Sequence, residues 1–517
     1  MSDQGAPHTP GLPTVIVLAA GEGKRMRSAL PKVLHPLLGR TMLGHVLATV
    51  RDAFADREGR AEAQIAVVVG HGGAQVRQHL SEIAPQSVPV TQTEQRGTGH
   101  AVRTALTALS GLSGTVVVLN GDIPLLRAST LWNLVHTHEQ AAAAATVLTA
   151  TVPDPTGLGR IVRGADGAVT GIVEERDATP EQRAIQEINS GAYAFDVEAL
   201  LLALGKLSTD NDQGEEYLTD VIGLMADSGA RVLAHGAPDL TETLGANDRV
   251  ELAQLRALLR ERVNTGWMRA GVAIIDPATT WIDVTVVADR DAVVEPNTHL
   301  RGSTTIGEGA CVGPDTTLID TTVGPGAVVL RTHAVEAQIG PQAQVGPFAY
   351  LRPGTRLARR SKVGTFVETK ATEIGEGAKV PHLSYLGDTT VGAGTNIGAA
   401  TVTANYDGTD KHRTVIGAHA RVGVDNMLVA PVVVGDGAYT AAGSVIVEDV
   451  PPGAMAIARG RQRNVEGWVA RQRPGTAAAQ AAETALAAEA ARAAAESAGS
   501  EAEQSHDPVG EDDHRNV

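Results

Sequence analysis

The chain has 517 residues, enough for two or three domains of ordinary size. Apolar residues make up 43% and charged residues 20%, the balance of a globular protein, while 3% aromatic residues and 57 glycines favour small side chains and tight turns. A net charge of −16 at pH 7 argues against non-specific binding to nucleic acid or to an anionic membrane surface. Basic residues that converge in such an acidic chain are expected to hold a small anion.

The cysteine content and the first residues of the chain indicate in which cellular compartment the protein is expected. The single cysteine, Cys311, excludes an internal disulfide framework and a multi-cysteine zinc site, and it fits a reducing compartment. Residues 1–13 carry no basic region followed by an apolar run, so no signal peptide is expected. No stretch reaches the roughly 18 uncharged apolar residues of a membrane span. We therefore expect a cytoplasmic protein.

Residues 14–245 alternate apolar strand-like runs with helical patterns. This rhythm predicts an open, mainly parallel α/β sheet, in which ligands bind beyond the carboxyl ends of the strands. Turns at Gly21, Gly70 and Gly121 follow three of the predicted strands, so the ligand site is expected there. The expected strands cover residues 14–20, 65–69, 115–119 and 145–151, and expected helices include residues 42–55 and 100–109.

The remainder divides into three segments. Residues 246–270 predict a linker with one helix over 247–263, and residues 469–517 predict a disordered acidic tail in which 477–498 could be transiently helical. Between them, residues 271–468 carry aliphatic side chains at every sixth position, with Ile-Gly or Val-Gly pairs twelve times between Ile306 and Val434. A six-residue period predicts a β-solenoid with one inward aliphatic residue on each short side.

The segment Leu18–Met26 directly follows the first predicted strand. Its glycines let backbone amides approach phosphate oxygens, and Arg25 and Lys32 add positive charge at the same end. The segment lacks both the Gly-Lys-Ser/Thr ending of a Walker motif and the glycine spacing of a Rossmann dinucleotide site.

Residues 18–26 resemble the signature of sugar-1-phosphate nucleotidyltransferases. Together with the solenoid, the chain resembles the bifunctional bacterial N-acetylglucosamine-1-phosphate uridyltransferases/glucosamine-1-phosphate N-acetyltransferases over residues ~14–468. Further motifs that carry this resemblance are residues 95–101, 121–125, 155–160, 171–174 and 187–191, with 381–388 and 403–407 in the solenoid.

The resemblance implies a fold and two reactions. The fold would be a Rossmann-like α/β uridyltransferase domain, a linking helix and a left-handed parallel β-helix of the hexapeptide type. The second domain would acetylate glucosamine-1-phosphate with acetyl-CoA. The first would then couple N-acetylglucosamine-1-phosphate to UTP, releasing pyrophosphate and giving UDP-N-acetylglucosamine, a peptidoglycan precursor. Such β-helices are usually homotrimers with sites between neighbouring chains.

Uridyl transfer brings two anions together, so its site needs a divalent cation and fixed positive groups. Asp122, just past a predicted strand, is a suitable oxygen ligand, and the resemblance makes Asp122 and Asn247 the Mg²⁺ ligands. Arg25 and Lys32 would hold the triphosphate and stabilise the transition state. The resemblance also assigns nucleotide contacts to Leu18, Ala19, Gly21, Gln92, Gly97 and Thr98, and acetamido-sugar contacts to Gly159, Glu174 and Asn189.

Amide formation needs a base, because an ammonium group cannot attack a thioester. The resemblance gives this role to His382, with Asn405 orienting its imidazole, while Arg352 and Lys370 hold the sugar phosphate. The other implied contacts are Tyr385, Asn396 and Tyr406 for the sugar, Lys411 and Arg459 for the anionic end of coenzyme A, and Ala399, Val424 and Ala442 around the acetyl group.

Four residues depart from the family pattern. Asn120 stands where relatives often carry tyrosine, and Ala400 stands where glycine is usual. Val424 replaces a usual serine and Asn426 a threonine, so a hydrogen bond worth about 1 kcal/mol near the acetyl group could be lost.

Two other hypotheses remain open. The chain could be a single-activity sugar nucleotidyltransferase with a structural β-solenoid, a role that would not need His382, Asn405 and Lys411. It could also be a non-catalytic regulatory scaffold, against which Arg25, Lys32 and Asp122 argue.

Overall fold

The computed structural model describes residues 12–55 and 63–504. The chain forms two compact units, residues 1–457 and residues 458–517, and each is considered by itself. Most of the predicted tail over residues 1–13 lies outside the described residues. None of the helices in the described ranges has the length and apolar character needed to cross a bilayer.

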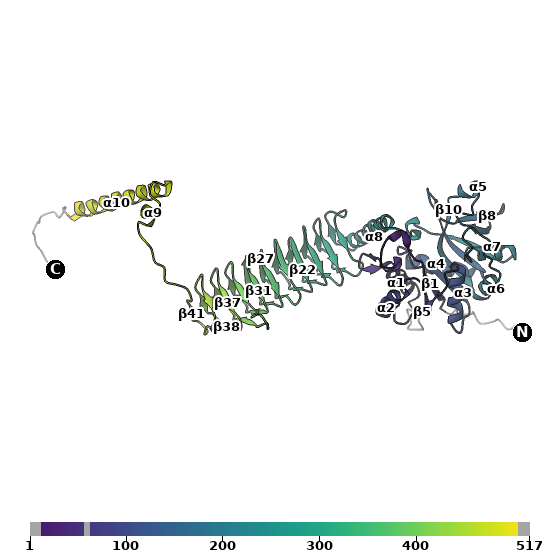
Figure 1. The fold of residues 1–517 in the computed structure, drawn as a ribbon, viewed down its shortest axis with the longest axis horizontal. Helices are drawn as coiled ribbons and strands as arrows, with labels where there is room; N and C mark the ends of the chain where they lie inside the picture. The colour runs from purple at the N-terminus through teal and green to yellow at the C-terminus, as the bar shows by residue number, and fades with distance from the viewer. Residues whose placement is uncertain (1–11, 56–62, 505–517) are drawn as a thin grey trace, which may run out of the picture. The chain divides into compact units, whose positions relative to one another are not determined.

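The first part of the chain folds around a nine-stranded mixed sheet with strand order β11-β7-β10-β6-β1-β4-β5, to which β8 and β9 are added beside β10 (Figure 1). Its strands are β1 (Thr14–Ala19), β4 (Ile65–Val69), β5 (Val88–Thr91), β6 (Thr115–Asn120), β7 (Ala145–Thr151), β8 (Arg160–Arg163), β9 (Val169–Val173), β10 (Glu187–Asp196) and β11 (Val232–Gly236). The hairpin β2 (Pro36–Leu37) and β3 (Arg40–Thr41) lies apart from this sheet.

Helices connect these strands. They are α1 (Met42–Phe54), α2 (Gly73–Ile83), α3 (Thr98–Ala108), α4 (Ala128–Gln140), α5 (Pro180–Arg183), α6 (Val197–Leu204) and α7 (Asp220–Asp227), with short 3-10 turns η1 (Lys24–Met26), η2 (Lys32–Leu34) and η3 (Leu240–Thr243). The predicted helices over 42–55 and 100–109 correspond to α1 and α3 within two residues at each end.

The three glycine turns lie at one edge of the sheet, as predicted. Strands β6, β1 and β4 are neighbours and run parallel, so Gly121, Gly21 and Gly70 follow adjacent carboxyl ends. A side chain at Gly70 would lie 2.7 Å from the Ala20 carbonyl, and one at Gly121 would lie 2.9 Å from the Leu18 carbonyl. These close approaches require glycine, because a Cβ atom has no room there.

The sheet also contains antiparallel strands that the rhythm of residues 14–245 does not reveal. Strand β10 runs antiparallel to both β6 and β7, and the β8–β9 hairpin pairs with its first half. The register of β10 against β7 shifts between Asn189 and Tyr193, where Gly191 takes a φ of 77°. This irregularity turns Asn189 toward the ends of β8 and β9.

Helix α8 (Arg249–Arg269) begins and ends later than the predicted helix over 247–263. The Asp248 side chain fixes its start by accepting hydrogen bonds from the amides of Val250 and Glu251. Its buried leucines pack on the sheet domain, and Asn264 donates to the carbonyls of Pro277 and Thr280 in the first coil of the solenoid. The helix therefore packs against both parts rather than only connecting them.

The hexad segment forms a left-handed parallel β-helix, as predicted, with three ladders of parallel strands. The first ladder has eleven strands: β12 (Ala273–Ile274), β15 (Val293–Val294), β18 (Cys311–Val312), β21 (Val328–Val329), β24 (Gln344–Val345), β27 (Lys362–Thr365), β30 (Lys379–His382), β33 (Asn396–Ile397), β36 (Arg421–Val422), β39 (Tyr439–Thr440) and β41 (Met455–Ala456). The second has ten: β13 (Trp281–Ile282), β16 (His299–Arg301), β19 (Thr317–Ile319), β22 (Thr332–Val335), β25 (Ala349–Leu351), β28 (Glu368–Lys370), β31 (Tyr385–Gly387), β34 (Val402–Ala404), β37 (Met427–Val429) and β40 (Val445–Ile446). The third has nine: β14 (Val287–Ala288), β17 (Thr305–Ile306), β20 (Thr322–Val323), β23 (Gln338–Ile339), β26 (Arg356–Leu357), β29 (Glu373–Ile374), β32 (Thr389–Val391), β35 (Thr414–Ile416) and β38 (Val432–Val434).

The interior of the β-helix contains one aliphatic residue from most of the short strands. Val294, Leu300, Ile306, Val312 and Leu318 follow one another at intervals of six and are 0–2% exposed. Each points inward from a successive side of the coil, which is the physical basis of the hexad.

The tail differs from the prediction of disorder. In the unit of residues 458–517, the structure has α9 (Trp468–Gln472) and α10 (Ala477–Gln504). Alanine loses no side-chain rotamer entropy in a helix, and the alanine-rich composition of this segment therefore favours helix without an apolar stripe. Over residues 477–497 all side chains are exposed except the half-buried Ala479 and Ala482, so this helix forms with little packing.

Candidate functional site

The first candidate site centres on Lys32, in η2. Its ammonium group forms an ion pair with Asp122, just past β6, and donates a 2.8 Å hydrogen bond to Oδ1 of Asn247, just before α8. The side chains of Lys32 and Asp122 are only 14% and 23% exposed. The Lys32 ammonium group thus contacts both predicted Mg²⁺ ligands, Asp122 and Asn247. Asn247 lies 215 positions from Lys32 in the sequence.

A cavity of about 330 Å³ lies beside this cluster. Gly23 adopts a φ of 64° there, and a Cβ atom at this position would lie 2.6 Å from Cβ of Lys32. Only glycine lets the loop cross so close to the lysine. The residues around the cavity are Gly21, Glu22, Gly23, Lys24, Arg25, Lys32 and Asn247, so the predicted phosphate-binding residues share one space. Leu18 and Ala19 lie at the end of β1, directly before this loop.

The predicted uracil contacts form a second group at the start of α3. Gln92 is 5% exposed, and its amide group donates to the Gly97 carbonyl at 3.1 Å. Gly97 has a φ of 106° and no room for a Cβ atom, because the Glu216 carbonyl would lie 2.4 Å away. Thr98 accepts a 2.9 Å hydrogen bond from the Leu218 amide. Gln95 connects this group to the loop after β1, since its side chain donates to the Ala20 carbonyl at 2.8 Å.

The predicted sugar contacts meet at the ends of β8, β9 and β10. The Asn189 amide donates to the Gly159 carbonyl at 2.9 Å, and a Cβ atom at Gly159 would lie 3.4 Å from the Glu174 carboxylate. Burial raises the pKa of Glu174, the charges of Asp220 and Asp177 act in the same direction, and a 3.1 Å hydrogen bond from Thr219 opposes them. Gly159 thus lies next to both Asn189 and the partly desolvated Glu174 carboxylate, so the three predicted sugar contacts are neighbours.

Asn120, which stands where relatives often carry tyrosine, lies near the predicted sugar contacts. Asn120 ends β6, and its side chain covers Gly191, where a Cβ atom would overlap its amide nitrogen. The asparagine thus occupies the space left by the glycine of β10, two residues from Asn189.

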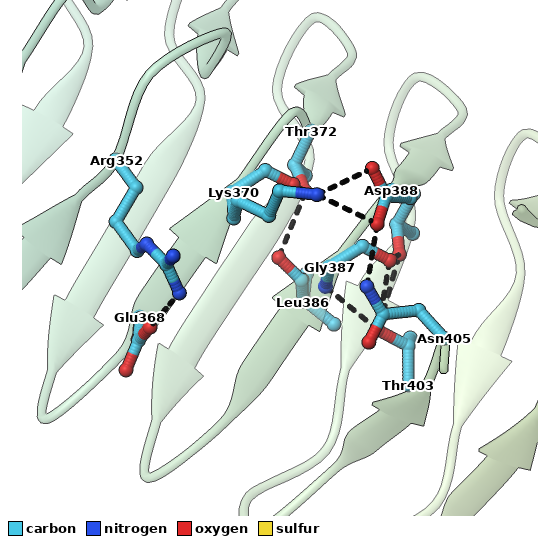
Figure 2. A network of polar contacts seen from close by, with 10 residues as sticks. Arg352, Glu368, Lys370, Thr372, Leu386, Gly387, Asp388, Thr403 and Asn405 are labelled. Atoms are coloured by element: carbon cyan, nitrogen blue, oxygen red, sulfur yellow. Dashed lines mark hydrogen bonds and ion pairs between the residues drawn. The ribbon is translucent and has the colours of Figure 1, made fainter. Parts of the chain in front are cut away.

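The second candidate site lies on the second ladder of the β-helix (Figure 2). The Lys370 ammonium group contacts both oxygens of Asp388 at 3.0 Å, and the Asn405 amide donates to the same carboxylate at 2.5 Å. Arg352 pairs with Glu368 at 2.9 Å. Burial alone would raise the pKa of Asp388, but the hydrogen bonds from Lys370 and Asn405 and the charges of Lys370 and Lys411 lower it below its ordinary value.

A column of backbone hydrogen bonds runs along the corner between the first and second ladders. The Ala400 amide donates to the His382 carbonyl. On the next coils, the Asp425 amide donates to the Ala399 carbonyl and the Gly443 amide donates to the Val424 carbonyl. His382, Ala399, Val424 and Ala442 therefore stack on successive coils, although they are 17–25 residues apart in the sequence. These four predicted residues form one exposed edge of the solenoid.

The predicted contact between Asn405 and His382 is not found. Across residues 12–55 and 63–504, no side chain forms a hydrogen bond with the exposed His382 imidazole, and the 7% exposed Asn405 bonds Asp388 instead. A carboxylate is a stronger acceptor than an imidazole, because a charged group shortens and strengthens the hydrogen bond. Asn405 is therefore part of the Lys370–Asp388 network within one copy of the chain.

The remaining predicted residues of this half divide by location. A Cβ atom at Gly387 would lie 2.6 Å from both the Tyr385 hydroxyl and the Asn405 amide, so Tyr385 joins the network. Tyr406 and Lys411 pair through their backbones in the loop after β34, and this loop adjoins the network through Asn405. Asn396 lies on the first ladder, around the corner from Lys370. Arg459 belongs to the unit of residues 458–517, and its role stays a prediction.

The departures in the acetyl region have clear local consequences. Asn426 is 1% exposed and donates from one amide nitrogen to the carbonyls of Val424 and Ala441 at 3.0 Å each. It thereby bridges two coils beside the predicted acetyl site, but its Oδ1 atom is buried without a hydrogen-bond partner. Ala400 takes a φ of 59°, a left-handed conformation that favours the glycine usual at this position.

Sequence reasoning missed the partners of the charged residues. Asp388, Glu368 and Thr219 each contact a predicted site residue, and Asp388 lies inside the motif of residues 381–388, which also contains His382 and Tyr385. No metal cluster of three or more His, Cys, Asp or Glu side chains exists in the described part of the chain, which leaves the carboxylate–amide pair Asp122/Asn247 as the predicted metal ligands.

Comparison with known proteins finds relatives that cover most of the chain. The model of the MobA-like NTP transferase domain family matches residues 15–182. The bifunctional protein GlmU of Streptomyces avermitilis is 60% identical over 470 residues, covering 90% of this chain and 96% of the relative. That of Thermobifida fusca is 59% identical over 472 residues, with the same coverage, and that of Mycolicibacterium vanbaalenii is 56% identical over 470 residues, covering 90% and 94%.

The chain belongs to the bifunctional GlmU family. This membership confirms the resemblance drawn from the motifs. As a GlmU protein, the chain is a bifunctional transferase of UDP-N-acetylglucosamine synthesis, with a uridyltransferase and an acetyltransferase activity. The alternatives of a purely structural solenoid and of a non-catalytic scaffold are thereby set aside.

Proposed function

We propose that the two reactions take place at separate sites, uridyl transfer in residues 14–245 with Asn247 and acetyl transfer in residues 271–468. The observation that carries this proposal is the presence of two independent cation–carboxylate clusters, Lys32–Asp122 and Lys370–Asp388, on different folds. Each carboxylate holds a half-buried lysine in a position where the lysine can also bind an anionic substrate.

In the uridyltransferase site, Asp122 and Asn247 suit Mg²⁺ because their oxygens already hold a cation, the Lys32 ammonium group. A carboxylate, an amide and substrate phosphates make a typical Mg²⁺ ligand set. The ion would supply charge neutralisation at the triphosphate. Arg25 and Lys32 bind phosphate oxygens, Gln92 and the Gly97–Thr98 turn hold the uracil, and Glu174 and Asn189 orient the sugar, so that its phosphate faces the α-phosphorus.

In the acetyltransferase site, Arg352 and Lys370 bind the phosphate of glucosamine-1-phosphate, while Glu368 and Asp388 hold these two side chains in place. His382 accepts a proton from the sugar amine, which then attacks the thioester carbon of acetyl-CoA. The thioester would lie along the column of Ala399, Val424 and Ala442, which stacks beside His382 on successive coils. Coenzyme A leaves as the thiol, and the amide product is N-acetylglucosamine-1-phosphate.

We further propose that the chain acts as a homotrimer whose acetyl sites lie between copies. Support comes from the same corner, where Phe348, Phe366 and Leu383 are 53–59% exposed on three successive coils. Exposed apolar side chains in such a row indicate an interaction surface. The substrates UTP and acetyl-CoA support a cytoplasmic location.

The test compares Asp122→Ala and His382→Ala in the full-length protein, with wild type as reference. Pyrophosphate release from UTP should disappear in Asp122→Ala while thiol release from acetyl-CoA persists, because the metal ligands serve one site only. His382→Ala should show the reverse. If one substitution abolished both activities in a folded protein, or if wild type released no thiol, the two-site assignment would be wrong.

A further inference from the structure

A cavity of about 740 Å³ lies where the sheet domain meets the first coils of the β-helix. The β2–β3 hairpin, α1 and α2 form one side, and α8 with the strands β13 and β16 forms the other. None of the residues predicted for either reaction lines it. Its volume is typical of cavities for small organic ligands, which span about 300–1,000 Å³.

The cavity collects positive charge in an acidic protein. Four arginines line it, Arg40, Arg51, Arg256 and Arg301, against the single carboxylate of Asp283. Arg51 pairs with Asp52, and Arg256 donates to the Pro36 carbonyl at 2.9 Å, while Asp283 accepts the Gly302 amide at 2.9 Å.

Two of these four arginines, Arg40 and Arg301, have no side-chain hydrogen bond or ion pair in the ranges 12–55 and 63–504. Arg301 is exposed, whereas the Arg40 side chain is half-buried. Burial lowers the pKa of Arg40, and the charge of Arg51 lowers it further. A guanidinium group that is partly removed from water beside a second one is unfavourable unless an anion binds both.

Apolar side chains also line both sides of the cavity, and one of them offers a ring surface. Leu47, Ile65 and Ile83 line the cavity on the side of the sheet domain, and Trp281 lines it on the side of the β-helix. The Arg260 guanidinium lies 4.7 Å above the Trp281 ring and fixes it in place. A flat ring packed on Trp281 would bury apolar area while its anionic group reaches the arginines.

The walls are held together before any ligand binds. The Val284 amide donates to the Leu38 carbonyl at 3.1 Å, and Gly39 lies so close to Asp283 that a Cβ atom would come within 2.8 Å of it. Thr41 bonds His79 at 2.9 Å across the hairpin and α2. A preformed site loses little freedom on binding.

We propose that this cavity binds an aryl phosphate, with the phosphate on Arg40 and Arg51 and the ring on Trp281. The site is separate from both catalytic clusters and does not depend on their assignment. It makes the junction between the two domains a ligand-binding element of the protein.

The test is isothermal titration calorimetry of the full-length protein with 1-naphthyl phosphate, in the presence of saturating UDP-N-acetylglucosamine, Mg²⁺ and acetyl-CoA to occupy the catalytic sites. We expect saturable binding with one site per chain. Arg40→Gln should weaken it by about tenfold, the effect of losing one charged hydrogen bond. Arg290→Gln, an exposed arginine of the β-helix outside the cavity, should leave the affinity unchanged.

A second variant and a second ligand test the contribution of the ring separately from that of the phosphate. Trp281→Leu should weaken binding of 1-naphthyl phosphate but not that of inorganic phosphate, which lacks the ring. The proposal fails if no heat of binding is seen with the catalytic sites filled, or if Arg290→Gln weakens binding as much as Arg40→Gln. It also fails if inorganic phosphate binds as tightly as the aryl phosphate, because the ring would then contribute nothing. Circular dichroism and thermal unfolding of each variant confirm that it is folded.

Discussion

At the scale of single residues, both candidate sites set a lysine against a partly buried carboxylate. Lys32 and Asp122 are 14% and 23% exposed, and Lys370 and Asp388 are 21% exposed each. Pairs so shielded from water interact more strongly than surface pairs, whose contribution is about 0–1 kcal/mol. The carboxylates thus fix the lysines in the positions from which they can bind phosphate.

Asp388→Asn tests this positioning role. The substitution keeps the size of the side chain but removes the charge that holds Lys370 and Asn405, so the KM for glucosamine-1-phosphate should rise by about tenfold. Uridyl transfer should not change. Steady-state kinetics of both reactions provide the measurement, and circular dichroism monitors folding.

Asp315→Asn is the matched control. Asp315 also occupies a β-helix corner with positive φ and bonds Arg331 at 3.2 Å, but it lies far along the solenoid from Lys370. Equal kinetic effects of Asp315→Asn and Asp388→Asn would mean that the change acts through the stability of the β-helix and not through Lys370.

Glu174→Gln tests the buried carboxylate of the sugar pocket. Burial raises the pKa of Glu174 above its ordinary value of 4.5, so between that value and the raised pKa the folded protein binds more protons than the unfolded chain. Stability contributed by this group is therefore present at low pH and is lost as the pH rises through the folded pKa. Glu174→Gln should flatten this part of the decline in thermal stability above pH 4.5.

Unfolding temperatures of wild type and Glu174→Gln from pH 4.5 to pH 8 provide the measurement. An unchanged difference between the two proteins across this range would show that Glu174 titrates as an ordinary exposed carboxyl. Glu181→Gln, an exposed carboxylate at the start of α5, is the control and should leave the profile of the wild type unaltered.

At the scale of elements, the β-helix corners require left-handed backbone conformations at many positions. Phe348, Phe366, Leu383, Ala400 and Asp425 have φ values between 48° and 59° on consecutive coils of one corner. Each non-glycine residue there costs about 1–2 kcal/mol. The interior aliphatic stack and the continuous ladders stabilise the coils enough to maintain this strain.

Ala400→Gly should therefore stabilise the β-helix by about 0.5–1 kcal/mol, because the gain at a φ of 59° is partly offset by the greater freedom of glycine in the unfolded chain. Differential scanning calorimetry of the β-helix transition provides the measurement. The converse control is Gly309→Ala, at a φ of 65° with open space around the added methyl, which should lower stability. A decrease for Ala400→Gly would contradict the strain argument.

At the scale of the whole molecule, the corner beside His382 presents an exposed apolar row. Phe348 and Phe366 stack with ring centroids 5.5 Å apart, and Leu383 follows on the next coil. An edge of this kind on a monomer is typical of an interface, and the corner also carries the predicted acetyl-CoA contacts. Assembly and acetyl transfer should therefore depend on the same side chains.

Phe366→Asp should dissociate the proposed trimer, because a buried charge without a partner is costly in an interface. We expect acetyl transfer to fall at least about tenfold, while uridyl transfer persists. Analytical ultracentrifugation and both activity assays provide the measurement. Leu202→Asp, at a 71% exposed position on α6, should change neither the mass nor the activities. A trimer that survives Phe366→Asp would place the interface elsewhere.

The sequence by itself determined the class of both domains. The six-residue repeat and the alternation of strand-like and helical segments are local patterns that recur along the chain. Each recurrence therefore supports the same prediction, a β-solenoid in one domain and an α/β sheet in the other. The glycine-rich loop after β1, the turn after β6 and the His382 motif also predicted the two site regions, because their chemistry is concentrated in short segments. The order β6-β1-β4 then placed Gly121, Gly21 and Gly70 at one edge, as expected.

Only the tertiary structure decided which side chains meet. The antiparallel course of β10, the bond of Asn405 to Asp388 and the cavity around Arg40 each join residues that no local pattern relates. The spacing of residues in the sequence predicts which face of a strand or helix a residue occupies. The hydrogen-bond partner of that residue depends on strand register, on the geometry of the corners and on which acceptors lie within reach. Asn405 donates to the Asp388 carboxylate because the fold brings that stronger acceptor within reach. Such a contact depends on the three-dimensional positions of the residues and cannot be inferred from their order in the sequence.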